Sequence, residues 1–360
     1  MKLIQKHAQK ARHRRSPLSM SIELLAPCNL KCPHCYVSHN KKNHLTFQVL
    51  DDLLEQFSNG GGFEVTLTGG EIGLRKDLFR IIQSARDRFL SVRLLSSGTR
   101  WGPSEWDRIA ELGVNKVRMS LYAMDPDVHD AVTLVKGSHE RTLATAYGLM
   151  ERGVEAAFSC PIMTTNAHEV PRVLDFANEL GVELAIDPHI TQTDAGDERP
   201  KELAADVEEL TALFRDPKVR AHFSTDNPCE TPADELRTCS VGRSSAFIDC
   251  KGDLYPCTTW HRPAGNILNQ RLLDIWRNSP ELNFARSITL GDQEGCRGCG
   301  DAGVCNQCVA MNLQERGDVA KPSQTVCDAS AAKSIALYGE SKQLRRKPIA
   351  QARASLPIVA

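Results

Sequence analysis

Strand-like and helix-like segments alternate through the first half of the chain, and this alternation restricts the fold more than any other feature. Six short apolar and β-branched runs are predicted strands: 22–25, 63–68, 91–95, 116–121, 154–158 and 182–186. Five stretches with helical apolar spacing lie between them: 46–57, 76–88, 104–112, 139–151 and 168–180. Such alternation favours a parallel sheet with right-handed crossovers. We therefore expect an α/β fold in which the six units form a partial (β/α)6 barrel.

Residue types that can bind a metal or a cofactor follow four of these strands, at the ends where a barrel carries its catalytic loops. In a TIM-like barrel those loops leave the C-terminal ends of the strands. Three cysteines follow the first predicted strand, Gly69, Gly70 and Glu71 follow the second, Ser97 follows the third, and Ser120 lies near the end of the fourth. The sequence thus predicts that all of these residues meet on one rim.

The three cysteines are Cys28, Cys32 and Cys35, in the spacing Cys-x3-Cys-x2-Cys. Thiolates are ligands for soft metals. An iron–sulfur cluster usually has four thiolate ligands, so three ligands leave one iron open to a small molecule. A structural zinc site is the alternative, and it would need a fourth ligand such as His34 or His39.

The spacing resembles the signature loop of the radical S-adenosylmethionine (SAM) enzymes, in which the open iron of a [4Fe–4S] cluster chelates SAM. Gly69–Gly70–Glu71 resembles the family's Gly-Gly-Glu motif, whose backbone and carboxylate receive the SAM amino group, although Ile72 replaces the frequent proline. His34 stands where the family places an aromatic residue near adenine; the alternative is a loop histidine without a special role. Ser97 and Ser120 are candidates for binding the SAM ribose or carboxylate, with turn formation as the alternative.

A second group of cysteines resembles the seven-cysteine SPASM extension, which binds auxiliary four-iron clusters in a subset of radical SAM enzymes. Segment 248–257 resembles the hairpin of that extension, and Gly265–Asn266–Ile267 followed by an apolar helix also matches it. The resemblance assigns one auxiliary cluster to Cys229, Cys239, Cys257 and Cys308. It assigns a second cluster to Cys296, Cys299, Cys305 and Cys327. Two residues separate Cys305 from Cys308 where the family usually has three, and a zinc knuckle is the alternative.

Cys160 and Cys250 remain outside these assignments. A lone cysteine at the end of a barrel strand is most often a small buried apolar residue. The sharper alternative is that Cys160 donates a hydrogen atom to a substrate radical. No other catalytic side chain is predicted.

Composition describes an ordinary globular protein and excludes several classes. The chain has 360 residues, of which 41% are hydrophobic and 25% charged. Its net charge of −1 gives no general attraction to nucleic acid or to anionic membranes, and no apolar run is long enough for a membrane helix. The N-terminus lacks a signal-peptide core, so the 13 cysteines favour metal binding in a reducing cytoplasm over disulfides.

Together, composition and resemblance divide the chain into five parts. They are a basic arm at 1–18, a radical SAM barrel at 19–190, an acidic connector at 191–228, a SPASM domain at 229–335 and a basic tail at 336–360. The connector is expected to carry a solvated helix at 202–214.

The resemblance implies an enzyme that reductively cleaves SAM to a 5′-deoxyadenosyl radical, which abstracts a hydrogen atom from its substrate. A reductant such as flavodoxin or ferredoxin would supply the electron. SPASM enzymes act most often on peptides, so we expect a peptide or protein substrate that is cross-linked, oxidised or decarboxylated. The 18 residues before the barrel are too few for a recognition domain, so a separate recognition protein is expected, or none. The alternatives are a small-molecule substrate, such as a porphyrin propionate or an aminoglycoside precursor, and a non-catalytic iron–sulfur electron carrier.

Overall fold

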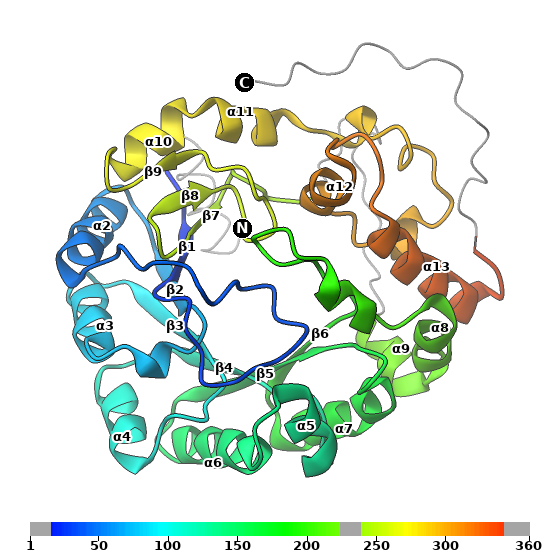
Figure 1. The fold of residues 1–360 in the computed structure, drawn as a ribbon, viewed down its shortest axis with the longest axis horizontal. Helices are drawn as coiled ribbons and strands as arrows, with labels where there is room; N and C mark the ends of the chain where they lie inside the picture. Colours follow the sequence, from blue (N-terminus) through cyan, green and yellow to red (C-terminus); the bar gives the residue numbers. More distant parts are fainter. Residues whose placement is uncertain (1–15, 224–238, 342–360) are drawn as a thin grey trace, which may run out of the picture.

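The computed structural model describes residues 16–223 and 239–341, in which one curved sheet is surrounded by helices (Figure 1). Within these residues the sheet has nine strands in the order β6-β5-β4-β3-β2-β1-β7-β8-β9. The strands are β1 (Ser19–Glu23), β2 (Glu64–Thr68), β3 (Ser91–Ser96), β4 (Lys116–Ser120), β5 (Glu155–Pro161), β6 (Glu183–Asp187), β7 (Ser245–Ile248), β8 (Asp253–Tyr255) and β9 (Gly265–Asn266). All neighbours from β1 to β6 pair in parallel, which confirms the predicted α/β barrel core.

Helices line the outside of this sheet, as Figure 1 shows for α2, α3, α4, α6 and α7. The α-helices of the described residues are α2 (Phe47–Asn59), α3 (Leu78–Asp87), α4 (Pro103–Glu111), α5 (Pro126–Thr133), α6 (Ser138–Met150), α7 (Val170–Leu180), α8 (Val207–Arg215), α9 (Pro217–Phe223), α10 (Leu272–Asn278), α11 (Pro280–Ser287), α12 (Val309–Arg316) and α13 (Gln324–Tyr338). Short 3₁₀ helices are η1 (Ile72–Leu74), η2 (Ala167–Glu169), η3 (Arg199–Leu203), η4 (Leu290–Asp292) and η5 (Ala302–Val304). None of the helices in these residues is both long and apolar enough to cross a membrane.

The sheet does not stop at the six predicted strands. β7 pairs with β1 in parallel, and the hairpin of β8 and β9 continues the sheet in antiparallel. These three strands come from the range expected to form a separate SPASM domain. The physical reason is that β1 would otherwise leave a row of backbone N–H and C=O groups without partners. The first part of that range therefore shares the backbone hydrogen bonding of the barrel.

Two further elements differ from expectation. Helix α5, which lies between β4 and α6, was not predicted, although Asp125 followed by Pro126 is a common helix start. The expected helix at 202–214 is divided into η3 and α8. It is not simply solvated, because Leu210, Leu213 and Phe214 are buried and α8 packs against α13. The predicted arm and tail lie largely outside the described residues.

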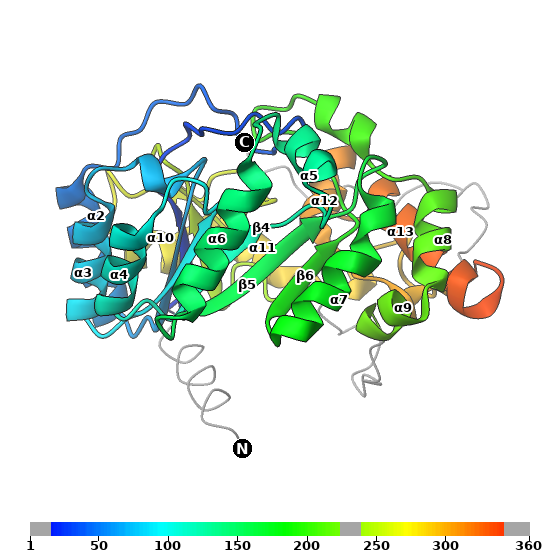
Figure 2. The same cartoon turned by 90° about the horizontal axis from the view of Figure 1, so that it is seen from below.

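One apolar cluster joins the barrel strands to their helices. Ile22, Leu67 and Leu94 are fully buried on β1, β2 and β3, and Leu50 and Leu54 of α2 belong to the same cluster. Burial on this scale fixes the strands relative to one another. The loop that leaves β1 consequently has a fixed base, and Figure 2 shows it along one edge of the molecule together with α5.

Candidate active site

The loop after β1 brings Cys28, Cys32 and Cys35 together, as the spacing predicted. Burial raises the pKa of Cys32 to about 12, and the charges of Cys35 and Cys28 add to this rise. Burial likewise raises the pKa of Cys28 to about 11, with Cys35 among its neighbours. Three thiols close enough to oppose one another's ionisation are a site where bound metal would compensate the negative charge.

The turn at Gly69 and Gly70 contacts the backbone of the cysteine loop. The Gly70 N–H donates to the Leu25 carbonyl at 2.8 Å, and the Glu71 N–H donates to the Pro27 carbonyl at 3.0 Å. A Cβ added to Gly70 would lie 2.2 Å from the carbonyl oxygens of Ala26 and Pro27. The close approach that requires glycine here is thus made by the backbone of the cysteine loop itself.

The Glu71 carboxylate makes hydrogen bonds within the protein. Its exposure is 0%, and its oxygens accept hydrogen bonds from the Gly73 N–H, the Ser96 hydroxyl, and both the N–H and the hydroxyl of Ser97. The side chain therefore joins the loops after β2 and β3. Its role in receiving the SAM amino group stays a prediction.

The two predicted serines, Ser97 and Ser120, also interact with other residues of the protein. The Ser97 hydroxyl donates to Glu71 at 2.5 Å and shares a 2.8 Å hydrogen bond with Thr99, which favours the turn-forming alternative. Thr99 in turn accepts a hydrogen bond from the Asn29 side chain, beside Cys28. Ser120 interacts with Tyr122. These contacts tie three strand-end loops into one support for the cysteines.

His34 packs edge-on against Tyr122, with ring centroids 5.0 Å apart. The Tyr122 hydroxyl lies 4.0 Å from the Cys32 sulfur. Burial lowers the pKa of His34 to about 4, so the imidazole is neutral near neutral pH. Its buried Nδ1 has no hydrogen-bond partner, which leaves a polar atom available to a ligand beside the thiols.

Cys160 does not reach this site. It is fully buried in the apolar cluster, and its nearest polar neighbours are the Tyr122 carbonyl and the Asn166 amide, each 3.8 Å from the sulfur. Burial raises its pKa to about 12. These surroundings support the buried apolar role and remove the basis for a hydrogen-atom donor. Cys250 is equally buried, 3.8 Å from the Lys42 carbonyl.

Comparison with known proteins agrees with this arrangement. Residues 22–177 match the radical SAM superfamily, a range that runs from β1 and the cysteine loop to α7. These residues form a radical SAM domain. Residues 239–300 match the SPASM iron–sulfur cluster-binding domain.

Three known proteins illustrate the range of the chain's similarities. It is 26% identical to the AdoMet-dependent heme synthase of Methanosarcina barkeri, over 84% of this chain and 94% of that one. It is also 26% identical to the PqqA peptide cyclase of Ruegeria pomeroyi, over 88% of each chain. The crystal structure of Streptococcus suis SuiB bound to precursor peptide SuiA superposes with a TM-score of 0.68, 18% identity, and coverage of 89% of this chain and 79% of that one.

The SPASM region brings its thiols into two groups. Burial raises the pKa of Cys257 to about 12, and Cys308 and Cys239 are the charged neighbours that add to it. Burial also raises the pKa of Cys296 to about 12. The thiols that add to that rise are Cys305, Cys327 and Cys299. The assignment of each group to one cluster stays a prediction, and Cys229 lies outside the described residues.

These donor sets suit the family's cofactors, which are [4Fe–4S] clusters and SAM. All members of the three groups are cysteines, the ligand that iron–sulfur clusters require. Across residues 16–223 and 239–341, no three His, Cys, Asp or Glu side chains converge tightly enough to hold a single metal ion. We therefore define each cysteine group by the thiols that raise one another's pKa.

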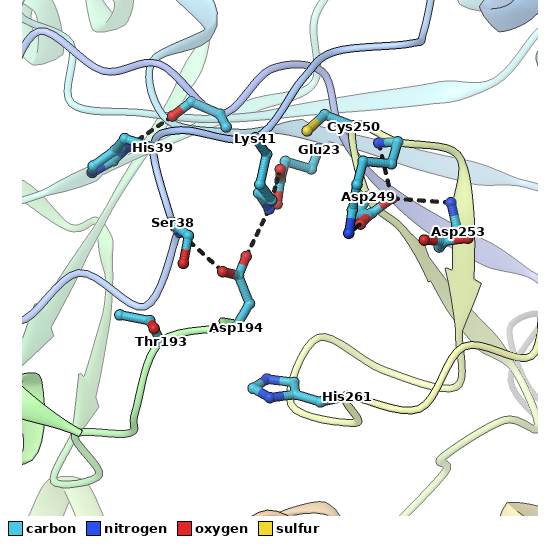
Figure 3. Close-up of polar contacts among 12 residues, drawn as sticks. Glu23, Ser38, His39, Lys41, Thr193, Asp194, Asp249, Cys250, Asp253 and His261 are labelled. Atoms are coloured by element: carbon cyan, nitrogen blue, oxygen red, sulfur yellow. Dashed lines mark hydrogen bonds and ion pairs between the residues drawn. The ribbon is translucent and has the colours of Figure 1, made fainter. Parts of the chain in front are cut away.

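A buried ion-pair network, which sequence reasoning missed, anchors the far end of the cysteine loop (Figure 3). Lys41 lies 2.6 Å from Glu23 on β1 and 2.6 Å from Asp194, which follows β6. The side chains of Lys41 and Glu23 are only 12% and 2% exposed. Burial opposes the charge on Lys41, but Glu23 and Asp194 together outweigh burial and raise its pKa. No local motif signals these contacts, because the partners are far apart in sequence.

Asp194 also binds the loop through its backbone. Its N–H donates to the Tyr36 carbonyl at 2.8 Å, and its carboxylate accepts the Ser38 N–H at 3.0 Å. The segment after β6 is thereby held against the residues that follow Cys35. Figure 3 shows the His261 ring on the far side of Asp194 from Lys41.

A cavity of about 690 Å³ opens between these two segments. Cys32, Cys35 and residues up to Asn40 line one side. Residues between Thr193 and Leu203 line the other. This volume lies within the usual size of small-molecule sites, about 300–1,000 Å³. The cavity thus gives a ligand direct access to two of the three signature thiols.

Proposed function

We propose that this chain is a radical SAM/SPASM enzyme that modifies a peptide or protein substrate. The observation that carries the proposal is the 690 Å³ cavity beside Cys32 and Cys35, on a barrel that also carries two auxiliary thiol groups. Cys28, Cys32 and Cys35 would hold the SAM-binding cluster. Cys239, Cys257 and Cys308, with Cys229, would hold one auxiliary cluster. Cys296, Cys299, Cys305 and Cys327 would hold the other.

When bound, these cofactors supply the one-electron cleavage of SAM and the abstraction of a hydrogen atom from the substrate. The protein itself orients the substrate and shields the reaction from water. Glu71 fixes the loop that carries Cys28, and Lys41 and Asp194 fix the segment after Cys35. A rigid cavity wall holds the reacting carbon in place and excludes water.

Oxidation of a substrate carbon also releases a proton, and we infer that His261, which lies near Asp194 and Lys41, accepts it. Burial lowers the pKa of His261, so its ring is neutral and basic near neutral pH. The Gln314 amide nitrogen lies 3.3 Å from Nε2 and 3.4 Å from Nδ1 of the ring.

The charges of the cavity wall favour a peptide over an acidic macrocycle. Arg199 is already paired with Asp197, and Glu202 adds a second carboxylate. The wall is therefore negative overall. A porphyrin with several propionates would meet electrostatic repulsion there, whereas a peptide segment with neutral or basic side chains would not.

A tetrapyrrole substrate remains the second candidate, because the chain resembles a heme synthase as closely as a peptide cyclase. The partners we propose are a precursor peptide, a low-potential reductant such as flavodoxin or ferredoxin, and a separate peptide-recognition protein where one exists. The oxygen-sensitive cofactors suit a reducing compartment such as the cytoplasm.

The first test uses protein purified and reconstituted without oxygen. It is expected to contain about 12 irons, corresponding to three four-iron clusters, and to release 5′-deoxyadenosine with dithionite and SAM. Cys32→Ala should lose this release. Intact SAM at full iron loading would replace the proposal with the electron-carrier alternative.

The second test identifies the substrate by mass spectrometry. Short peptides from open reading frames beside the gene are the test substrates; one of them should lose hydrogen or carbon dioxide, while a propionate-bearing porphyrin stays unchanged. The reverse result would establish the second candidate.

A further inference from the structure

Helix α13 connects the barrel to the second thiol group of the SPASM region, which comprises Cys296, Cys299, Cys305 and Cys327. The helix packs against α8 and against η5, the short turn that directly precedes Cys305. Figures 1 and 2 both show α13 between α12 and α8. Cys327 itself lies in the first turn of α13. Side chains on the buried face of this helix are therefore close to the second thiol group.

Lys333 is a charged residue on that buried face, with an exposed fraction of only 7%. Its Nζ lies 4.5 Å from the ring centroid of Phe223 and 5.6 Å from that of Phe214. The two rings pack edge-on, with their centroids 5.1 Å apart. Aromatic faces attract a desolvated cation. The rings therefore support the ammonium group of Lys333 in a place that water reaches poorly.

A buried ammonium also requires negative charge nearby. The anionic groups that favour the charged form of Lys333 are Cys305 first and Asp187 second. The Asp187 side chain is 61% exposed and already accepts a hydrogen bond from the His189 N–H. Solvent and His189 therefore weaken its effect on the lysine. Cys305 is the main counter-charge of Lys333.

The Ser330 hydroxyl acts on the same cysteine. Ser330 precedes Lys333 by about one helical turn and is 4% exposed. Its hydroxyl hydrogen-bonds to the Cys305 thiol, which opposes the rise that burial causes in the pKa of this cysteine. Within the described residues its oxygen has no other hydrogen-bond partner. One turn of α13 thus directs a positive charge and a hydroxyl toward a single sulfur.

We propose that Lys333 and Ser330 raise the reduction potential of the iron–sulfur cluster that the second thiol group would hold. The physical reason is that nearby positive charge and hydrogen bonds to sulfur stabilise the reduced, more negative state of such a cluster. Both are positioning residues, because they act through Cys305 and do not touch the substrate. This inference rests on the proposed function, which includes that cluster. In the proposed reaction the substrate radical loses one electron and the cluster gains it, while Lys333 keeps its proton and forms no bond.

The test measures the reduction midpoint of this cluster in the reconstituted holoenzyme, without SAM or substrate. Dithionite lowers the potential in the presence of mediator dyes, and electron paramagnetic resonance follows the reduced cluster. The signal of this cluster is the one that Cys299→Ala removes. Lys333→Met removes the charge at similar side-chain size, and Ser330→Ala removes the hydroxyl. Lys321→Met is the matched control, because Lys321 lies in the same region but its side chain is 67% exposed.

We expect Lys333→Met to lower the ratio of reduced to oxidised cluster at a fixed potential about tenfold, which is a midpoint about 59 mV lower. Ser330→Ala should lower the ratio about threefold. Lys333→Arg, which keeps the charge, and the control Lys321→Met should stay within about twofold of the unmodified enzyme. An unchanged midpoint in Lys333→Met at full iron content would overturn the proposal. If that variant loses iron, an unchanged midpoint in Ser330→Ala overturns it instead.

The same measurement separates this proposal from the proposed function, because it does not depend on SAM cleavage. Shifted midpoints in a protein that never releases 5′-deoxyadenosine would refute the proposed function and leave the role of Lys333 in place. Normal SAM cleavage with unshifted midpoints would do the reverse. An equal shift of all three clusters in Lys333→Met would indicate a general change of the fold and would also overturn the proposal.

Discussion

The barrel site and the SPASM region both gather cysteines, but they hold them by different means. Around Cys28, three strand-end loops are joined by a buried carboxylate with four donors and by backbone contacts at Gly70. In the SPASM region, Cys296 and Cys299 lie in a turn, and Cys308 precedes the short helix α12. The first site is fixed by the fold, whereas the second is built from turns and short helices.

The apolar core of the barrel also differs from that of the SPASM region, because it is much larger. The barrel strands and their helices form one large buried cluster. The cluster around Trp260 is much smaller, with Val241, Ala285, Ile288, Val309, Ala310 and Val319 as its other buried members. Small cores leave a region dependent on metals or other cross-links. The comparison therefore predicts that iron contributes more to folding in the SPASM region than in the barrel.

The largest effect is expected from Gly70→Ala, which disturbs the backbone contacts that position the cysteine loop of the barrel. The new Cβ would lie 2.2 Å from two backbone oxygens, which have no flexible side chain to yield. The cysteine loop must shift, so we expect about four irons fewer and a loss of SAM cleavage of about a thousandfold. Iron content and 5′-deoxyadenosine release provide the measurement.

Gly303→Ala is the matched control in the SPASM region. A Cβ at Gly303 meets no atom within 4 Å. Iron content and SAM cleavage should therefore equal those of the unmodified protein. Normal activity in Gly70→Ala would mean that the loop is not held as the structure describes.

The next largest effect is expected from Lys41→Met. The substitution leaves the buried Glu23 without its counter-charge, and breaking a buried pair costs about 3–5 kcal/mol of the free energy of unfolding. Urea unfolding monitored by circular dichroism measures this cost. Adding Glu23→Gln should recover part of the loss, because it removes the unpaired charge. If the double variant is as unstable as the single one, the pair contributes through packing and not through charge.

Iron removal tests the contrast between the two regions directly. In chelated protein, backbone amides between Ile288 and Val319, which lie outside the large barrel cluster, should exchange hydrogen about a hundredfold faster than in the iron-loaded protein. Amides of β2 to β5 should change by less than about tenfold, because their core is independent of metal. Mass-spectrometric hydrogen exchange resolves the regions. Equal acceleration in both would show that the barrel also depends on its cluster for folding.

The same contrast explains what the sequence could predict. The order of strands and helices and the meeting of Cys28, Cys32 and Cys35 follow from local patterns and short spacings, and the structure reproduces both. The hydrogen bonds of Glu71 were missed because its partners depend on how two loops face each other after folding. The addition of β7 to β1 was missed for a similar reason, since the two strands are separated by most of the chain.

Long-range ion pairs show this limit most clearly. Lys41 follows the cysteine loop among other polar residues, and Asp194 lies in a segment whose composition predicts an acidic connector. Only the barrel topology brings the end of β6 beside the loop that leaves β1. Sequence patterns fix neighbours within an element, whereas contacts between loops depend on the tertiary structure.

The smallest of the four effects is expected at His261, a residue of the SPASM region that lies near Asp194. Burial lowers the pKa of this histidine below its ordinary 6.5, so the ring is mostly neutral near neutral pH. Substrate conversion should therefore fall as the pH is lowered and the ring takes up a proton, and this fall should occur at a lower pH than for an exposed histidine. His261→Asn should lower conversion about tenfold. SAM cleavage should not change, since the proton leaves the substrate after cleavage. Liquid chromatography of both products across pH measures the two rates, and an equal fall in both would assign His261 to positioning the auxiliary region instead.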